Sequence, residues 1–215
     1  MPSFSVYCNM DIIFATHNEH KTIEARNIVG PNWHLKNLRE IGQTEEIPET
    51  SDTLQGNALQ KAQYVAEKYH ANCFADDTGL EIEALDGRPG VYSARFAGEH
   101  CTYADNVNKA LAEMKGKTNR KACFKTVIAL ILNGETYYFE GRVDGHIAEE
   151  PHGDGGFGYD PIFIPDGYEQ SFAELGMDVK NKISHRGEKP TMEELDNMCK
   201  HEKIGDKNKS IGFKN

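Results

Sequence analysis

Asn133-Gly134, which follows a mostly apolar segment and precedes its predicted strand partner, constrains the fold of this chain more than any other feature. Residues 124–132 form an apolar run, and residues 135–142 follow the dipeptide as its partner. Asn-Gly between two such segments is the strongest short-range signal for a type I′ turn, because both central residues must adopt positive φ. The middle third of the chain is therefore predicted to be antiparallel, with a further strand at residues 143–148.

The beginning of the chain has a different pattern. Residues 12–15 are apolar and predict a short buried strand, which leads through a polar turn into a helix that ends at Val29, before Gly30-Pro31. A second strand is predicted at residues 33–38. A β-α-β start followed by an antiparallel middle predicts a mixed sheet in an α/β or α+β domain.

Three further helices are predicted downstream. Residues 53–69 place apolar side chains at intervals of three and four, which is typical of a helix with one buried face. Asp52 and Gln55 resemble a capping box at its start. Residues 103–114 form the next predicted helix and residues 191–201 the last one.

Two adjacent carboxylates, Asp76 and Asp77, stand out near the centre of the chain. They follow an apolar segment and precede Thr78-Gly79, after which residues 80–84 alternate between apolar and acidic. We expect the pair to lie at the rim of a sheet, where a glycine turn begins, with the two side chains on opposite sides of the backbone. A carboxylate fixed there can bind a hard metal ion or hold an attacking water, although an ordinary polar turn fits the same residues.

A second candidate site lies at the start of the first predicted helix. A strand that delivers a polar turn into a helix N-terminus creates an anion site, because the first-turn amides are unpaired and the helix dipole is positive there. Thr16 and Asn18 can add donors and Lys21 a positive charge, although a helix cap with a solvated lysine fits as well. His17 and His20 form an H-x-x-H pair without a nearby third ligand, so we interpret them as surface residues rather than a metal site.

Two other parts of the chain carry candidate residues. Glu49 precedes the helix at residues 53–69 and is a candidate partner for Asp77 around a cation. The glycine-rich segment 153–161 matches G-x-G-x-x-G formally, but it ends in a proline where that motif requires a helix. Phe157 can stack on a flat ring, and Asp160 can accept hydrogen bonds from the edge of that ring. An equally good interpretation is a packed hairpin corner in which Phe157 belongs to the hydrophobic core.

Composition narrows the range of partners. Lys and Arg number 24 and Asp and Glu 34, so the net charge of −10 argues against broad electrostatic binding of DNA or RNA. A nucleotide needs only a few local cations or a bound metal.

No apolar run is long enough for a membrane span, and no signal-peptide pattern opens the chain. The 5 scattered cysteines form no CxxC pair, so we expect neither disulfides nor zinc, and a cytoplasmic location.

Taken together, the motifs resemble those of the inosine triphosphate pyrophosphatase family over residues 10–201. Each motif is modest by itself, but their order and spacing are specific. The segments that carry the resemblance are Ala15-Thr16-His17-Asn18 with Lys21, Glu49-Thr50, Asn57-Ala58 with Lys61-Ala62, Ala75-Asp76-Asp77-Thr78-Gly79-Leu80, Pro89-Gly90-Val91-Tyr92-Ser93-Ala94-Arg95, Gly155-Gly156-Phe157-Gly158-Tyr159-Asp160-Pro161 and Ile183-Ser184-His185-Arg186-Gly187.

The resemblance implies an elongated mixed α/β fold, in which a long central sheet and two lobes flank a nucleotide cleft. It implies one domain at residues 10–201, while residues 1–9 and 202–215 are expected to be a disordered leader and tail. It also implies a homodimer, a Mg²⁺ cofactor and a nucleoside triphosphate substrate such as ITP, dITP or XTP. Cleavage between the α- and β-phosphates would give the nucleoside monophosphate and pyrophosphate.

The resemblance also implies a role for individual residues. Glu49 and Asp77 would bind the metal, and Asp77 as general base with Lys61 would carry the catalysis. The phosphate loop, residues 16–21, would hold the triphosphate, and the glycine-rich segment would cradle the base. The substrate-binding residues would be Thr16, His17, Asn18, Glu19, His20, Lys21, Thr78, Phe157, Gly158, Tyr159, Asp160, Lys180, His185 and Arg186, with Arg95 a further candidate.

Three positions depart from the family pattern. His17 stands where glycine is common, and Thr78 where serine is frequent. Gly56 replaces a frequent glutamate and is expected to weaken the helix by up to about 1 kcal/mol. Two alternatives remain beside the main hypothesis: a pyrophosphatase of the same architecture for modified pyrimidine nucleotides, and a catalytically silent nucleotide-binding module. The presence of Glu49, Asp77 and Lys61 counts against the silent module.

Overall fold

The computed structural model describes residues 10–29, 33–175 and 179. Three predicted segments lie outside these residues: the helix at 191–201, the leader at 1–9 and the tail at 202–215. None of the described helices has the length and apolar character needed to cross a membrane.

The described residues form a mixed α/β structure around a seven-stranded sheet. Six strands follow the order β2-β1-β3-β5-β6-β7 across the sheet. The seventh strand, β4, pairs with β3 outside this order. The strands are β1 (Met10–Phe14), β2 (Trp33–Asn37), β3 (Cys73–Ile82), β4 (Pro89–Gly90), β5 (Lys121–Leu132), β6 (Glu135–Ile147) and β7 (Phe163–Pro165), and the helices are α1 (Glu19–Val29), α2 (Leu54–Tyr69) and α3 (Tyr103–Met114). Strand β1 pairs in parallel with β2 and β3, while the other pairs are antiparallel. The predicted mixed sheet is confirmed.

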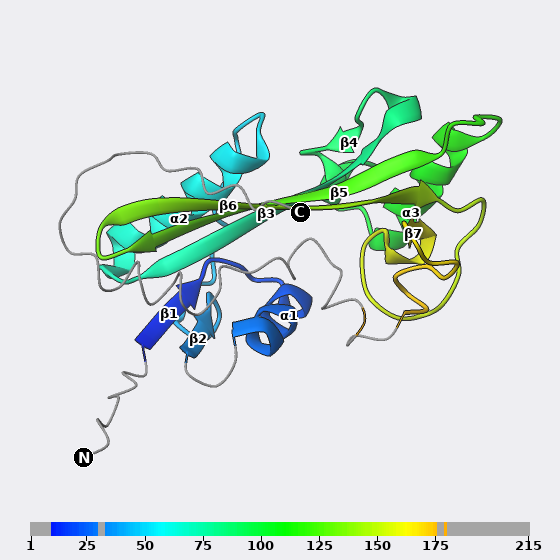
Figure 1. The fold of residues 1–215 in the computed structure, drawn as a ribbon. Coiled ribbons are helices and arrows are strands. Elements are labelled where there is room, and N and C mark those ends of the chain that lie inside the picture. The colour runs from blue at the N-terminus through cyan, green and yellow to red at the C-terminus, as the bar shows by residue number, and fades with distance from the viewer. Residues whose placement is uncertain (1–9, 30–32, 176–178, 180–215) are drawn as a thin grey trace, which may run out of the picture.

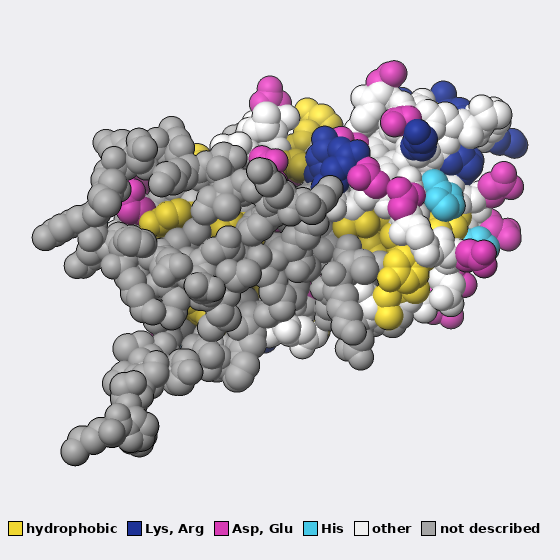
Figure 2. All heavy atoms as spheres, in the orientation of Figure 1, with side chains coloured by type: hydrophobic (Ala, Val, Ile, Leu, Met, Phe, Trp, Pro, Cys, Tyr) yellow, Lys and Arg dark blue, Asp and Glu magenta, His cyan; other side chains and the backbone are white. Residues whose placement is uncertain are grey.

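The sheet gives the molecule an elongated shape. Strands β3, β5 and β6 cross it from end to end as one long band (Figure 1). Helices α1 and α2 lie beside one half of this band, and α3 and β7 lie at the other end. On the described part of the face in Figure 2, Lys and Arg side chains lie among Asp and Glu rather than in one broad basic surface.

The long strand β3 contributes to two separate hydrophobic cores. Near its start it buries Cys73 and Ala75 beneath α2. Near its end it buries Leu80 and Ile82 in a core that includes α3 and β7. The polar residues 76–78 lie between these cores, so they mark the boundary between two lobes.

Alternation along β1 separates a third core from the first. Ile13 and Ala15 face the core beneath α2. Ile12 and Phe14 face the other side, where they pack with Ala25 of α1. Because successive side chains of a strand point to opposite faces, α1 and α2 cover opposite faces of the same half of the sheet.

The predicted hairpin is confirmed, with longer strands than expected. Asn133 and Gly134 both have positive φ, 51° and 85°, as a type I′ turn requires. Strand β5 begins at Lys121 rather than at residue 124, and β6 runs without a break through the two segments predicted at 135–142 and 143–148. The helix at 103–114 has the predicted bounds.

The prediction that Asp76 and Asp77 lie at the rim of a sheet is wrong. Strand β3 continues through them to Ile82, and β5 pairs with both of them. Gly79 is not part of a turn, because it belongs to β3 and pairs with Lys125 of β5. A Cβ there would lie 2.6 Å from the carbonyl oxygen of Gly90. The glycine permits close passage of β4, which the local sequence cannot distinguish from a turn.

The predicted capping box at Asp52 and Gln55 is also wrong. Helix α2 begins one residue later, and the Thr53 hydroxyl accepts a hydrogen bond from the Gly56 N–H at 3.0 Å. A Cβ at Gly56 would collide with the side chains of Ser51 and Thr53. Glycine at this position therefore makes room for the cap, in addition to lowering helix propensity.

Candidate active site

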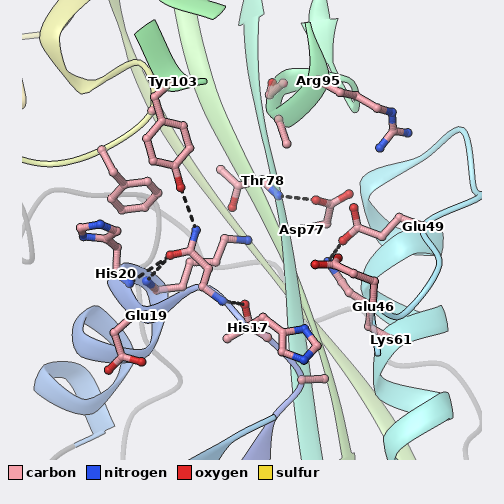
Figure 3. Close-up of a pocket in the computed structure, with 18 of the residues that line it drawn as sticks. His17, Glu19, His20, Glu46, Glu49, Lys61, Asp77, Thr78, Arg95 and Tyr103 are labelled. Atoms are coloured by element: carbon pink, nitrogen blue, oxygen red, sulfur yellow. Dashed lines mark hydrogen bonds and ion pairs between the residues drawn. The ribbon is translucent and has the colours of Figure 1, made fainter. Parts of the chain in front are cut away.

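A cleft of about 790 Å³ lies over the polar middle of β3, between the two lobes. Most of the residues singled out in the sequence line it (Figure 3). They are Thr16, His17, Asn18, Glu19, His20, Lys21, Glu49, Lys61, Asp77, Thr78, Arg95, Phe157, Gly158, Tyr159 and Asp160. Lys180, His185 and Arg186 lie outside the described residues.

Asp77 is held firmly on the α2 side of β3. Its carboxylate accepts hydrogen bonds from the Asn57 side chain at 3.1 Å and from the Thr78 N–H at 2.9 Å. Only 8% of the residue is exposed. Burial raises the pKa of Asp77, while the nearby Lys61 charge acts to lower it and the Glu49 charge raises it further.

Lys61 stands between the acidic groups. It projects from α2, is buried to the same degree as Asp77, and forms an ion pair with Glu49. Burial acts to lower the pKa of Lys61, but the carboxylates around it, with Glu49 first and Asp77 next, raise it overall. Lys61 therefore remains a cation at neutral pH.

Glu49 and Asp77 face the same part of the cleft, as Figure 3 shows. They come from distant parts of the chain, a loop before α2 and the middle of β3. Among the described residues, no group of three or more His, Cys, Asp or Glu side chains could hold a metal ion. Two carboxylates suit Mg²⁺, which completes its shell with water and phosphate oxygens, and do not suit a closed zinc site.

Asp76 points to the opposite side of β3 from Asp77, as predicted. Its carboxylate forms an ion pair with Lys21 of α1 at 2.9 Å, and the residue is only 2% exposed. The sequence pattern predicts no partner for Asp76. The pairing depends on α1 packing against this face of the sheet, which a local pattern does not reveal.

The phosphate loop combines capping with a candidate anion site. The Asn18 side chain accepts hydrogen bonds from the N–H groups of His20 at 3.0 Å and Lys21 at 3.3 Å, so it caps α1. Thr16 accepts a hydrogen bond from the Asn18 N–H at 3.1 Å. The amides of His20 and Lys21 are thus bonded to the Asn18 side chain, while the positive end of the α1 dipole lies at the cleft that these residues line.

The two histidines of this loop have different surroundings. His17 Nε2 lies 2.8 Å from the carbonyl oxygen of Gln43, so this ring is fixed within the protein rather than free at the surface. The His20 ring stacks on Phe157, with ring centroids 5.4 Å apart. The interpretation of both as ordinary surface residues is therefore incomplete.

Phe157 belongs to the cleft and not to the hydrophobic cores of the described residues. Besides His20 it contacts Tyr103, whose ring centroid lies 6.2 Å away. The Tyr103 hydroxyl accepts a hydrogen bond of 3.3 Å from the Asn18 amide, which links α3 to the phosphate loop. Tyr103 was not singled out from the sequence, because it is also the first residue of a predicted helix.

Asp160 and Tyr159 are used by the protein itself. The Asp160 carboxylate accepts a hydrogen bond from the Phe157 N–H at 2.7 Å and is 4% exposed. The Tyr159 hydroxyl donates to the Ser93 carbonyl at 2.9 Å, and burial raises its pKa. Both residues therefore shape the loop that presents Phe157, and contact with a base remains a prediction.

Comparison with known proteins places these features in a family. Residues 12–190 match the model of the Ham1 family. The chain is 56% identical over 176 residues to a dITP/XTP pyrophosphatase of Porphyromonas gingivalis, covering 81% of this chain and 91% of the relative. It is 50% identical over 182 residues to the dITP/XTP pyrophosphatase of Bacillus subtilis, covering 83% and 92%. The structure of the Ham1 protein of Staphylococcus aureus superposes with a TM-score of 0.77 at 36% identity, covering 90% of this chain and all of that one.

Proposed function

The chain belongs to the Ham1 family, and from this premise we propose that it hydrolyses non-canonical purine nucleoside triphosphates such as dITP, ITP and XTP. The products are the nucleoside monophosphate and pyrophosphate. One structural observation supports this function most directly. Asp77, Lys61 and Glu49, which come from three segments, meet in one cleft beside the phosphate loop.

Cations of the protein bind the triphosphate in this proposal. Lys21 and Lys61 approach the cleft from opposite sides of β3, and the first-turn amides of α1 add partial positive charge. In an acidic protein these groups offset the repulsion of a tetra-anionic substrate. They also stabilise the charge that develops on phosphoryl oxygens during cleavage. Both lysines carry carboxylate partners, so substrate binding has to compete for them.

Glu49 and Asp77 are the residues that would hold Mg²⁺. When bound, this ion neutralises phosphate charge and lowers the pKa of a coordinated water. Asp77 accepts the proton of the attacking water as general base. Without a bound cation, burial raises the pKa of Asp77 toward the working pH, which favours proton acceptance from water.

The base is proposed to stack on Phe157 at the other end of the cleft. Arg186, which lies outside the described residues, is the predicted hydrogen-bond donor to the 6-oxo group of hypoxanthine or xanthine. Adenine has an amino group at that position, so donor would face donor, and an unpaired buried polar group costs roughly 1–3 kcal/mol.

We also propose, on the resemblance alone, that the protein forms a homodimer.

The decisive experiment measures release of pyrophosphate from ITP, dITP, XTP, ATP and GTP, with and without Mg²⁺. We expect rapid release from the first three, slow release from ATP and GTP, and loss of activity when Mg²⁺ is chelated. Preference for a modified pyrimidine nucleotide in the same panel would support the alternative pyrophosphatase. Binding of ITP without any release would support the silent nucleotide-binding module.

A further inference from the structure

Gln43 lies behind the cleft and uses every polar atom of its side chain. Its Oε1 accepts hydrogen bonds from Lys68 Nζ at 2.7 Å and from the Tyr69 hydroxyl at 2.9 Å. Its Nε2 donates to the Glu45 carbonyl at 2.9 Å and approaches the Tyr64 hydroxyl at 3.4 Å. The residue is 2% exposed. Only a primary amide offers two acceptor and two donor positions at one site, so no other side chain of this length can replace it fully.

The backbone of Gln43 makes two further contacts. Its N–H donates to the Leu38 carbonyl at 2.9 Å, which closes the turn after β2. Its carbonyl lies 2.8 Å from His17 Nε2, and since a carbonyl can only accept, this histidine nitrogen is the donor. His17 belongs to the phosphate loop. The loop is therefore tied to the backbone of a residue whose side chain is fixed on α2.

These contacts join three parts of the proposed active site. The phosphate loop is held through His17, and α2, which carries Lys61 and Asn57, is held through its last turns. The third part is the segment that follows Gln43 and includes Glu49, which we call the acidic segment, residues 45–49. Its first residue accepts the amide hydrogen bond of Gln43.

We propose that Gln43 is a positioning residue that sets the separation between the phosphate loop, the acidic segment and α2. It does not line the cleft, so it would touch neither the substrate nor the reacting atoms. It acts through His17 on the groups that hold the triphosphate, and through the acidic segment on Glu49. This inference rests on the proposed function for its kinetic consequence, whereas its structural consequence can be measured without nucleotide.

Hydrogen exchange of the nucleotide-free and metal-free protein tests the structural part. Gln43→Met has nearly the same length but cannot form the four side-chain contacts. We expect it to increase amide exchange at residues 16–21 and 45–49, with little change in β5 and β6. Arg120→Met is the matched control, because Arg120 also donates to two backbone carbonyls, those of Ile147 and Ala148, and lies outside the cleft. Arg120→Met should increase amide exchange only near Ile147 and Ala148.

Two further variants keep the test decisive if Gln43→Met folds poorly. Gln43→Glu retains the acceptors for Lys68 and Tyr69 and loses the donors, so exchange should increase at residues 45–49. His17→Ala leaves the Gln43 side chain intact, so increased exchange should be confined to residues 16–21. Unchanged exchange at both segments in these variants, or a uniform increase throughout the protein, would overturn the proposal.

Kinetics provide the second readout. Gln43→Met should lower kcat/KM for ITP by about tenfold or more. A loss of this size is typical when a residue that orients a metal ligand through hydrogen bonds is replaced. Gln43→Glu should recover part of this loss, and Arg120→Met should stay near the wild type. A wild type inactive on every nucleotide would refute the proposed function while leaving the exchange result valid. Normal exchange in a variant with reduced kcat/KM would refute the positioning role alone.

Discussion

Asp77 is a buried carboxylate with two hydrogen-bond donors and a lysine nearby. We expect Asp77→Asn to reduce turnover of ITP by a factor on the order of 10²–10⁴, because the amide cannot accept a proton from water. Nucleotide binding should persist, since Lys21 and Lys61 remain. Pyrophosphate release measures the first effect and titration calorimetry the second. Turnover at the wild-type rate would remove Asp77 from the mechanism.

The raised pKa of Asp77 makes a separate prediction about stability. In the unfolded chain Asp77 loses its proton near pH 3.9, whereas in the folded protein it does so at higher pH. As pH rises through this window, the unfolded state releases the proton first. The unfolding free energy of the wild type should therefore fall relative to Asp77→Asn, by about 1.4 kcal/mol per unit of pKa difference.

Urea unfolding of both proteins between pH 4 and pH 8, without divalent cations, measures this difference. Effects of the substitution that do not depend on pH, such as an amide facing the Thr78 N–H, shift the difference in unfolding free energy equally at every pH. They do not alter its change with pH. At pH values above the raised pKa the difference should level off. A difference that is flat, or that changes in favour of the wild type with rising pH, contradicts the burial argument.

Among the elements, β3 shows most clearly how one strand serves both structure and chemistry. Its two ends are anchored in different cores, and its middle carries the carboxylates. Because β1 and β5 flank it, its backbone is fixed on both sides at its start and along β5 for its full length. Rigid placement of this kind keeps catalytic groups within the small tolerances that activity requires.

The close approach of β4 to β3 gives a prediction at this scale. Gly79→Ala places a Cβ against the Gly90 carbonyl, and backbone cannot move aside as a flexible side chain can. We expect a loss of about 1–3 kcal/mol in unfolding free energy and increased amide exchange around residues 89–95. Calorimetry and exchange measure the two effects.

Gly116→Ala is the appropriate comparison. Gly116 has φ of +77° but open space where a Cβ would lie, so its replacement introduces backbone strain without a steric collision. It should lower stability by about 1–2 kcal/mol and leave exchange at residues 89–95 unchanged. If both variants affect that segment equally, close passage of β4 is not the reason for the glycine.

In the whole molecule, the two lobes supply different halves of the proposed substrate site. The lysines and the phosphate loop belong to the lobe that contains α1 and α2, whereas Phe157 and Tyr103 belong to the lobe that contains α3. The lobes touch across the cleft through Asn18 and Tyr103 and through His20 and Phe157. The proposed sites for the phosphates and for the base therefore lie in different lobes.

This separation predicts the behaviour of Phe157→Ala. The variant should raise KM for ITP much more than it raises the inhibition constant for inorganic triphosphate, which lacks a base. Stacking on one aromatic ring is worth about 1–3 kcal/mol, so the increase for ITP should lie between about fivefold and 150-fold. Equal effects on both ligands would show that Phe157 supports the loop and does not bind the base.

Local patterns determined much of this protein by themselves. The Asn133-Gly134 hairpin, the β-α-β start and the bounds of α3 depend on near neighbours, and they were predictable for that reason. The order and spacing of the motifs identified the family and selected most of the residues that line the cleft.

Tertiary structure decided what depends on contacts between distant segments. The position of Asp76 and Asp77 in mid-strand, the pairing of Asp76 with Lys21 and the role of Gln43 all require elements that are remote in sequence to pack together. The local sequence does not distinguish a glycine that begins a turn from a glycine that allows a neighbouring strand to approach closely. Only the arrangement of β3 against β4 and β5 distinguishes them, because steric exclusion acts between atoms close in space and not between neighbours in sequence.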